Sequence, residues 1–126
     1  MKVLQIVQTA YRATIEEQDD TILWLTQAMK GAGADLDVLL RANAVNYVLI
    51  GQDATGIAFG DWRQTQPPKL ADDLARMMSK GISIYVVADD LAERGLRDAP
   101  CVEGVKPIQR NALPRLINSY DRIWSW

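Results

Sequence analysis

Histidine is absent from this chain of 126 residues. It is the commonest general base and metal ligand of proteins, and it is the base in Ser–His–Asp and Cys–His catalysis. Both catalytic arrangements are therefore excluded within this chain. A conventional zinc site would need an unusual shell made mainly of carboxylates. We accordingly expect no bound metal.

Cysteine is scarce as well, because Cys101 is the only one. A single cysteine cannot close a disulfide within the chain, which argues against a secreted disulfide framework. Residues 1–20 do not have the pattern of a signal peptide, and no run reaches the roughly 20 apolar residues that span a bilayer. The net charge of −2 gives no electrostatic reason to expect nucleic acid or a membrane as partner. We expect a cytoplasmic protein.

The length of the chain predicts a single domain, residues 1–126. Strand-like and helix-like segments alternate along it. Apolar runs predict strands at residues 2–9, 35–41, 82–88, 104–108 and 121–126. Apolar spacing predicts helices at 21–32, 70–80, 89–94 and 111–120, with a short helix within 42–50. The expected helix caps are Asp19 or Asp20, Asp89 or Asp90, and Asn111. This order predicts an α/β fold, a three-layer sandwich of about five mostly parallel strands with helices on both faces.

Residues 51–68 form the least regular stretch, with three glycines and two prolines. A loop of this length is usually functional or part of an interface. Phe59 and Trp62 suit an interface hot spot, and folding back over the domain's own core is an equal alternative. Trp124 and Trp126 lie on one face of the last predicted strand, where they would leave apolar surface uncovered. They too favour self-association.

The run "GISIYVVADDLAERGL", the following "GVKPI" and the closing "LPRLINSYDRIWSW" resemble the C-terminal half of the DsrE/DsrF/DsrH-like family. The residues that carry this resemblance are Arg94, Gly95, Leu96, Gly104, Val105 and Asp121. The resemblance implies a flavodoxin-like sandwich that assembles into homo-oligomers, trimers or hexamers. It also implies a link to sulfur relay or sulfur oxidation, in which a cysteine persulfide hands sulfur to partner proteins.

In such family members the sulfur-carrying cysteine ends the strand before the Arg-Gly helix, which here falls near Val86–Ala88. No cysteine stands there, and the family also contains subunits without it that serve beside a cysteine-bearing partner. The resemblance thus implies either a binding or scaffold subunit or a sulfur carrier that uses Cys101. Arg97 could lower the thiol pKa of Cys101, whereas Asp98 and Glu103 oppose that effect. A buried apolar filler is the alternative that the residue type favours.

A different class of function is open at the predicted strand ends, where α/β sheets bind ligands. Thr9, Tyr11, Arg12 and Thr14 could hold an anion. Asp89 with Asp90 could bind a cation or act as acid and base, although helix capping explains both aspartates more simply. The usual nucleotide motifs are missing, so we expect no cofactor. The alternative function is therefore a small-molecule (anion or nucleotide) binding module without sulfur chemistry.

Overall fold

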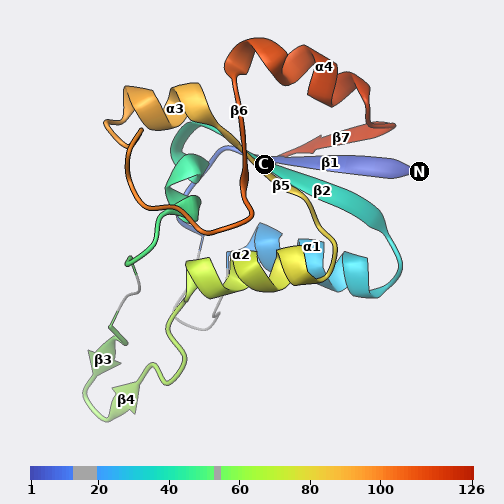
Figure 1. The fold of residues 1–126 in the computed structure, drawn as a ribbon. Coiled ribbons are helices and arrows are strands. Elements are labelled where there is room, and N and C mark those ends of the chain that lie inside the picture. Colours follow the sequence, from blue (N-terminus) through green and yellow to red (C-terminus); the bar gives the residue numbers. More distant parts are fainter. Residues whose placement is uncertain (13–19, 53–54) are drawn as a thin grey trace.

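The computed structural model of the chain describes residues 1–12, 20–52 and 55–126. Its centre is a five-stranded, fully parallel sheet in the order β6-β5-β2-β1-β7 (Figure 1). The strands are β1 (Lys2–Val7), β2 (Asp35–Leu40), β5 (Ile84–Val87), β6 (Lys106–Ile108) and β7 (Arg122–Ser125). The prediction of about five parallel strands is confirmed.

Helices cover both faces of this sheet, as predicted (Figure 1). The helices α1 (Thr21–Gly31) and α2 (Leu70–Ser79) lie on one face, and α4 (Leu113–Asn118) lies on the other. The short helix α3 (Ala88–Glu93) lies beyond the carboxyl ends of the strands. Two 3₁₀ helices follow strands, η1 (Ala42–Val48) after β2 and η2 (Arg110–Ala112) after β6. None of the helices in the described ranges is long and apolar enough to cross a membrane.

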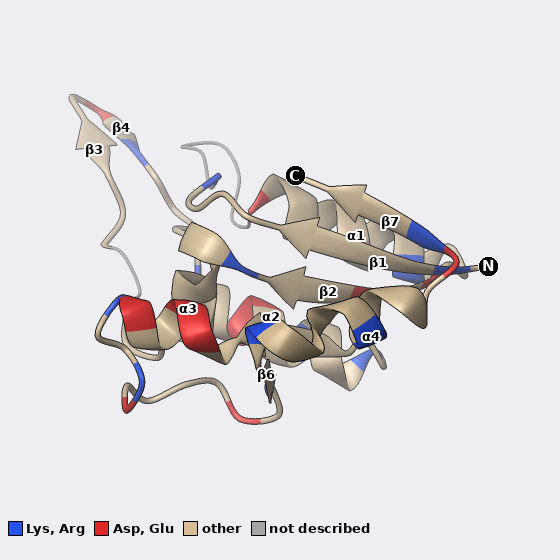
Figure 2. Cartoon of the chain, turned by 90° about the horizontal axis from the view of Figure 1, so that it is seen from above, with Lys and Arg blue, Asp and Glu red and all other residues tan. Residues whose placement is uncertain are grey.

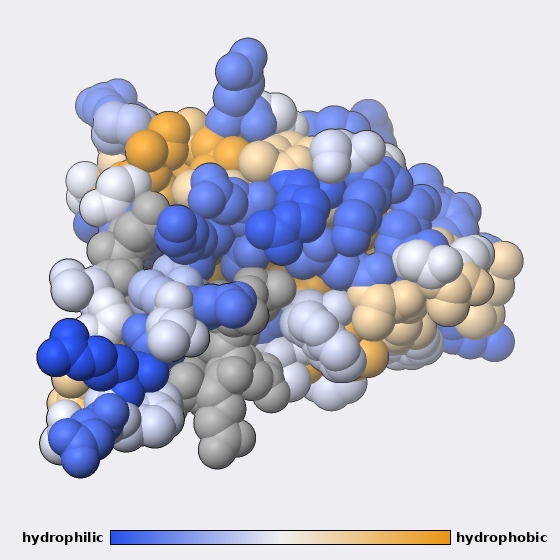
Figure 3. Space-filling model, turned by 90° about the horizontal axis from the view of Figure 1, so that it is seen from below, coloured by the Kyte–Doolittle hydropathy of each residue, from blue (hydrophilic) through white to orange (hydrophobic). Residues whose placement is uncertain are grey.

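The sheet is the middle layer because its central strands are apolar on both sides. In β1 and β2 every residue except the first is buried. Val38 packs with Leu23 of α1 and Leu74 of α2 on one face, and Leu39 packs with Leu113 of α4 on the other. The face that carries α1 and α2 is hydrophilic along its middle, with apolar atoms gathered nearer its borders (Figure 3).

Only one of the predicted helix caps is confirmed. Asp20 caps α1, accepting the Ile22 and Leu23 N–H groups at 2.8 and 3.1 Å, whereas Asp19 lies outside the described residues. Val87 precedes α3 without a side-chain cap, so Asp89 and Asp90 lie inside its first turn. A 3₁₀ turn comes before α4 and makes Ala112 its N-cap residue, so the prediction for Asn111 is wrong.

Part of the irregular stretch 51–68 forms a small antiparallel hairpin of β3 (Ala58–Phe59) and β4 (Trp62–Arg63). Residues 55–66 project away from the body of the molecule (Figure 1). Phe59 is 61% exposed and Trp62 is 42% exposed. The alternative that these two side chains cover the domain's own core is therefore wrong, and their role in an interface stays a prediction.

Candidate functional site

A cavity of about 610 Å³ lies beside α3 and β6, within the size range of small-molecule pockets. Apolar side chains supply most of its wall, among them Val86, Leu91 and Val105. Polar groups also reach it, namely Asp89, Glu93, Arg97 and Gln109, and so does Cys101. This mixture of an apolar wall with a few polar groups is typical of sites that bind small molecules.

Cys101 reaches this cavity because its segment pairs with the chain that leaves η1. Cys101 forms a short antiparallel bridge with Leu49. Val102 donates its N–H to the Val48 carbonyl at 2.8 Å, and Ile50 donates to the Pro100 carbonyl at 3.1 Å. These backbone bonds hold residues 100–102 against the body while β5 and α3 supply the facing wall.

The Cys101 thiol is half-buried, and its Sγ donates a hydrogen bond to the Ala99 carbonyl at 3.3 Å. Burial raises the pKa of this thiol above its usual value. Burial is the one influence on that pKa, so the expected lowering by Arg97 is not found, although Arg97 lines the same cavity. At neutral pH the side chain is therefore mainly a protonated thiol.

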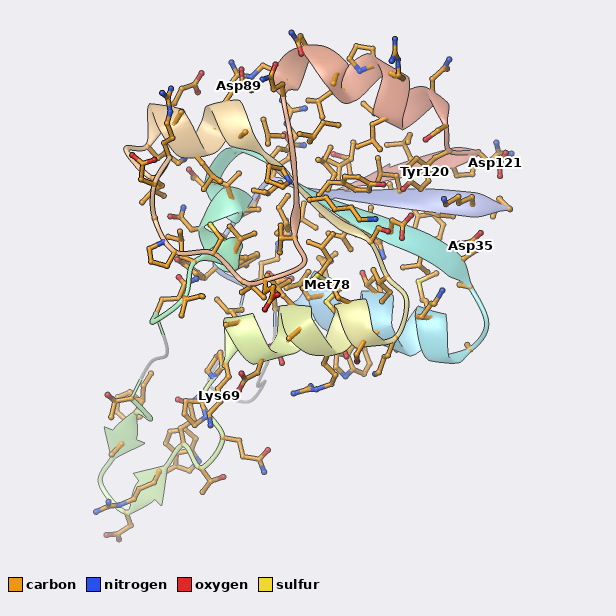
Figure 4. All side chains as sticks on the ribbon, viewed as in Figure 1. Asp35, Lys69, Met78, Asp89, Tyr120 and Asp121 are labelled. Atoms are coloured by element: carbon orange, nitrogen blue, oxygen red, sulfur yellow. The ribbon has the colours of Figure 1, made fainter. Side chains whose placement is uncertain are left out.

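Asp89 and Asp90 connect β5 with the strands on either side of it. Asp89 Oδ1 accepts the Arg110 backbone N–H at 2.8 Å, between α3 and the segment that leads into α4 (Figure 4). Asp90 Oδ2 accepts the Ala42 backbone N–H at 2.7 Å. Each carboxylate thus binds the first residue of a 3₁₀ helix, η2 after β6 or η1 after β2. The two aspartates hold together the carboxyl edge of the sheet.

Asp90 is the buried member of this pair, and Arg110 is its counter-ion. Burial alone would raise the Asp90 pKa, but the Ala42 N–H, the Arg110 guanidinium and the nearby charge of Arg94 together bring it below its usual value. Arg110 also binds Glu93 Oε1 at 2.8 Å, and these two carboxylates raise the Arg110 pKa. Sequence reasoning missed Arg110. The available signal was its position two residues after the predicted strand 104–108, the next predicted strand along the chain after the one that ends at the two aspartates.

The other predicted ligand-binding residues lie elsewhere on the molecule. Tyr11 donates its hydroxyl to Gln52 Oε1 at 2.7 Å, and its ring packs edge-on against Tyr47 with centroids 5.3 Å apart. Arg12 donates its backbone N–H to the Tyr47 hydroxyl at 3.2 Å, and Thr9 is exposed. Thr14 lies outside the described residues. Thr9, Tyr11 and Arg12 do not line the cavity described above, so Asp89 is separated from these three residues.

The tryptophans of the last strand lie on the α1 side of the sheet. Trp126 Nε1 donates to Gln5 Oε1 at 2.7 Å, and Gln5 in turn donates to Thr26 Oγ1 of α1 at 2.8 Å. Trp126 nevertheless remains 40% exposed, and Trp124 is partly buried. Part of the predicted apolar surface is therefore present at this edge.

These features define a small three-layer α/β protein with a cavity beside α3 and the edge strand β6. Its fold is similar to that of the YchN protein from E. coli, with a TM-score of 0.72, 19% identity and full coverage of both chains. It is also similar to BT1422 from Bacteroides thetaiotaomicron, a conserved protein of unknown function, with a TM-score of 0.59 and 17% identity over 98% of this chain and 94% of that one.

A third similar structure is MTH1491 from Methanobacterium thermoautotrophicum, also of unknown function, with a TM-score of 0.58 and 12% identity. That match covers 98% of this chain and 96% of the other. No protein-family model and no curated protein matches the sequence. At these identities the likeness establishes the fold, and function must be argued from the site.

Proposed function

We propose that this chain is a cytoplasmic DsrE-like protein of sulfur relay or sulfur oxidation, and that Cys101 carries the sulfur. The observation that supports the proposal is that Cys101 lines the same cavity as Val86 and Ala88. The family resemblance assigns the usual sulfur-carrying cysteine to the positions near Val86–Ala88. The Cys101 thiol can therefore react in the same cavity as a cysteine at those positions would, although Cys101 comes more than a dozen residues later in the sequence.

The proposed chemistry is a single sulfur transfer. The Cys101 thiolate attacks the outer sulfur of a small persulfide R–S–SH, the S–S bond of the donor breaks, and R–S⁻ leaves and takes up a proton. The product is a Cys101 persulfide. Arg97 lines the cavity and would favour the anionic form of that persulfide. No histidine is required, because the attacking group is the ionised thiol itself.

Incubation with glutathione persulfide followed by intact-protein mass spectrometry tests this proposal. We expect an added mass of one sulfur, about 32 Da, on the wild-type chain and none on Cys101→Ser. Loading should be faster at pH 9 than at pH 7, because burial raises the Cys101 pKa and the thiolate fraction grows with pH up to that pKa. Equal loading of wild type and Cys101→Ser would contradict the assignment.

Anion binding is the second candidate function, and a separate observation favours it. Arg12 Nη1 and Arg41 Nε are buried and have no hydrogen-bond partner among the residues that the structure describes. Both residues follow strands at the carboxyl edge of the sheet, after β1 and β2. A chain that accepts no sulfur at Cys101 but melts at a higher temperature in sulfate or phosphate would have this function instead. A chain that does neither would fit a binding or scaffold subunit.

A further inference from the structure

We propose that the sulfur donor of the Cys101 cavity is the persulfide of a free amino acid, cysteine persulfide, whose carboxylate is bound by Arg97 and whose ammonium group is bound by Asp89. The inference rests on the sulfur transfer proposed above and names the class of donor that the cavity selects. The charged side chains that line the cavity carry the argument.

Three charged side chains line the cavity, Asp89, Glu93 and Arg97. Figure 2 shows acidic residues on α3 and basic residues beside and after it. Glu93 already has a counter-ion, because its Oε1 lies 2.8 Å from the Arg110 guanidinium. Arg97 has none, since no carboxylate in the described part of the chain lies within ion-pair distance of it. A guanidinium in this position is suited to bind a carboxylate through two parallel hydrogen bonds.

Asp89 supplies the opposite charge. Its Oδ1 accepts the Arg110 backbone N–H at 2.8 Å, which orients the carboxylate without neutralising it. Among the residues that the structure describes, no cationic side chain lies within ion-pair distance of Asp89. One N–H fills only part of the acceptor capacity of a carboxylate. An ammonium group can therefore bind to the same side chain.

Arg97, Asp89 and Cys101 reach the cavity from three segments of the chain. Asp89 lies in the first turn of α3, Arg97 lies in the turn after that helix, and Cys101 lies on the segment that pairs with Leu49. Much of the remaining wall is apolar. A matching donor has one carboxylate, one ammonium group and a short apolar stem that ends in sulfur. An amino acid whose side chain ends in a persulfide has this constitution and no net charge.

The transfer from this donor balances without a further reactant. The Cys101 thiol gives up its proton, and the thiolate attacks the outer sulfur of cysteine persulfide. The S–S bond of the donor breaks, and the leaving cysteine thiolate takes up the proton. Cys101 ends as a persulfide and free cysteine is released. Its departure also removes the carboxylate from Arg97, which is then available to the Cys101 persulfide anion.

Four donors test the two contacts separately. Cysteine persulfide carries both charges, the persulfide of mercaptopropionate only the carboxylate, that of cysteamine only the ammonium group, and that of mercaptoethanol neither. The readout is the initial rate of mass gain below donor saturation and at about pH 7, where carboxylates are ionised and amino groups are protonated. Arg97→Gln should slow loading from the two donors with a carboxylate by about threefold to fivefold, the range for a partly exposed ion pair. Asp89→Asn should slow loading from the two donors with an ammonium group by a similar factor.

Each variant should load at the wild-type rate from the two donors that lack the group it binds. Arg115→Gln and Asp72→Asn are the matched controls, because they make the same changes at exposed positions of α4 and α2 that do not line the cavity. Both should match the wild-type chain with all four donors. An equal loss with all four donors in Arg97→Gln would show that Arg97 acts only on the sulfur of Cys101, and would overturn the proposal. Unchanged rates in Arg97→Gln and Asp89→Asn would overturn it as well.

Binding of S-methylcysteine separates this inference from the sulfur-carrier function. This compound keeps both charges but has no sulfur to transfer. By ligand-detected NMR it should bind to the wild-type chain and to Cys101→Ser, and more weakly to Arg97→Gln. A chain that binds S-methylcysteine in this way but accepts no sulfur from any donor would keep the amino-acid site and contradict the carrier function. A chain that accepts sulfur from all four donors but does not bind S-methylcysteine would keep the carrier function and overturn the inference.

Discussion

Replacing Ala88 by phenylalanine is expected to slow the loading of Cys101 with sulfur by about tenfold or more, because access to a reacting group is sensitive to small displacements. Ala88 is the first residue of α3 and lines the cavity that Cys101 also lines. A phenyl group at this position would occupy the space through which a small persulfide reaches the thiol. The half-buried position of Ala88 leaves room for the larger side chain without opening the core.

The matched control for this variant is Ala28→Phe, which makes the same change at an exposed position of α1. Both variants should unfold in urea with similar midpoints, and the control should accept sulfur at the wild-type rate. Loading at the wild-type rate in a folded Ala88→Phe chain would show that Cys101 is reached by another route. Measuring the rate by quenched mass spectrometry separates this effect from slow unfolding.

Replacing Asp90 by alanine is expected to lower the free energy of unfolding by about 2 kcal/mol at pH 7, the range for a buried hydrogen bond to a charged group. The variant leaves the Ala42 N–H without its acceptor and removes the buried partner of Arg110. Ala42 has a φ of 50°, a left-handed conformation that costs an alanine about 1 kcal/mol. The Asp90 carboxylate therefore also holds a strained residue in place.

The effect of Asp90→Ala should depend on pH in a defined direction. The folded-state pKa of Asp90 lies below its ordinary value of 3.8, so its stabilisation is complete above that value and is lost as the pH falls through the folded pKa. The difference from wild type should thus be constant from pH 7 to pH 5 and shrink in stronger acid. Asp89→Ala is the control. Its carboxylate is more exposed, so urea unfolding should show a smaller loss, and an equal loss would contradict the special role of Asp90.

The centre of the parallel sheet could be predicted from the sequence because β1 and β2 are buried at every residue except the first. Segments rich in Leu and Val, such as residues 35–41, predicted β2 almost to its ends, and the alternation with helices predicted the layers. The hairpin β3–β4 could not be predicted, because strands of two residues are too short to show a period. The caps predicted at Asp89, Asp90 and Asn111 failed because long-range partners and a 3₁₀ turn replaced local capping.

The candidate site was only partly predictable for a related reason. Cys101 and Asp89 were both recognised from the sequence, but their presence in one cavity depends on the return of residues 96–105 beneath α3. Thr9, Tyr11 and Arg12 follow β1, which is separated from β5 by β2 in the sheet. The order of the strands in the sheet therefore separates these residues from Asp89. The sequence alone does not give this order, so it could not predict the separation.

Trapping the sulfur state of Cys101 in living cells tests the central claim most directly. Cells that make the chain would be lysed into an excess of an alkylating reagent, and the peptide that contains Cys101 would be analysed by mass spectrometry. We predict a fraction of this peptide that carries one additional sulfur beneath the alkyl group. A peptide found only as the alkylated thiol, under conditions where chain loaded in vitro and added to the same lysate is detected, would contradict the role of Cys101 as a sulfur carrier.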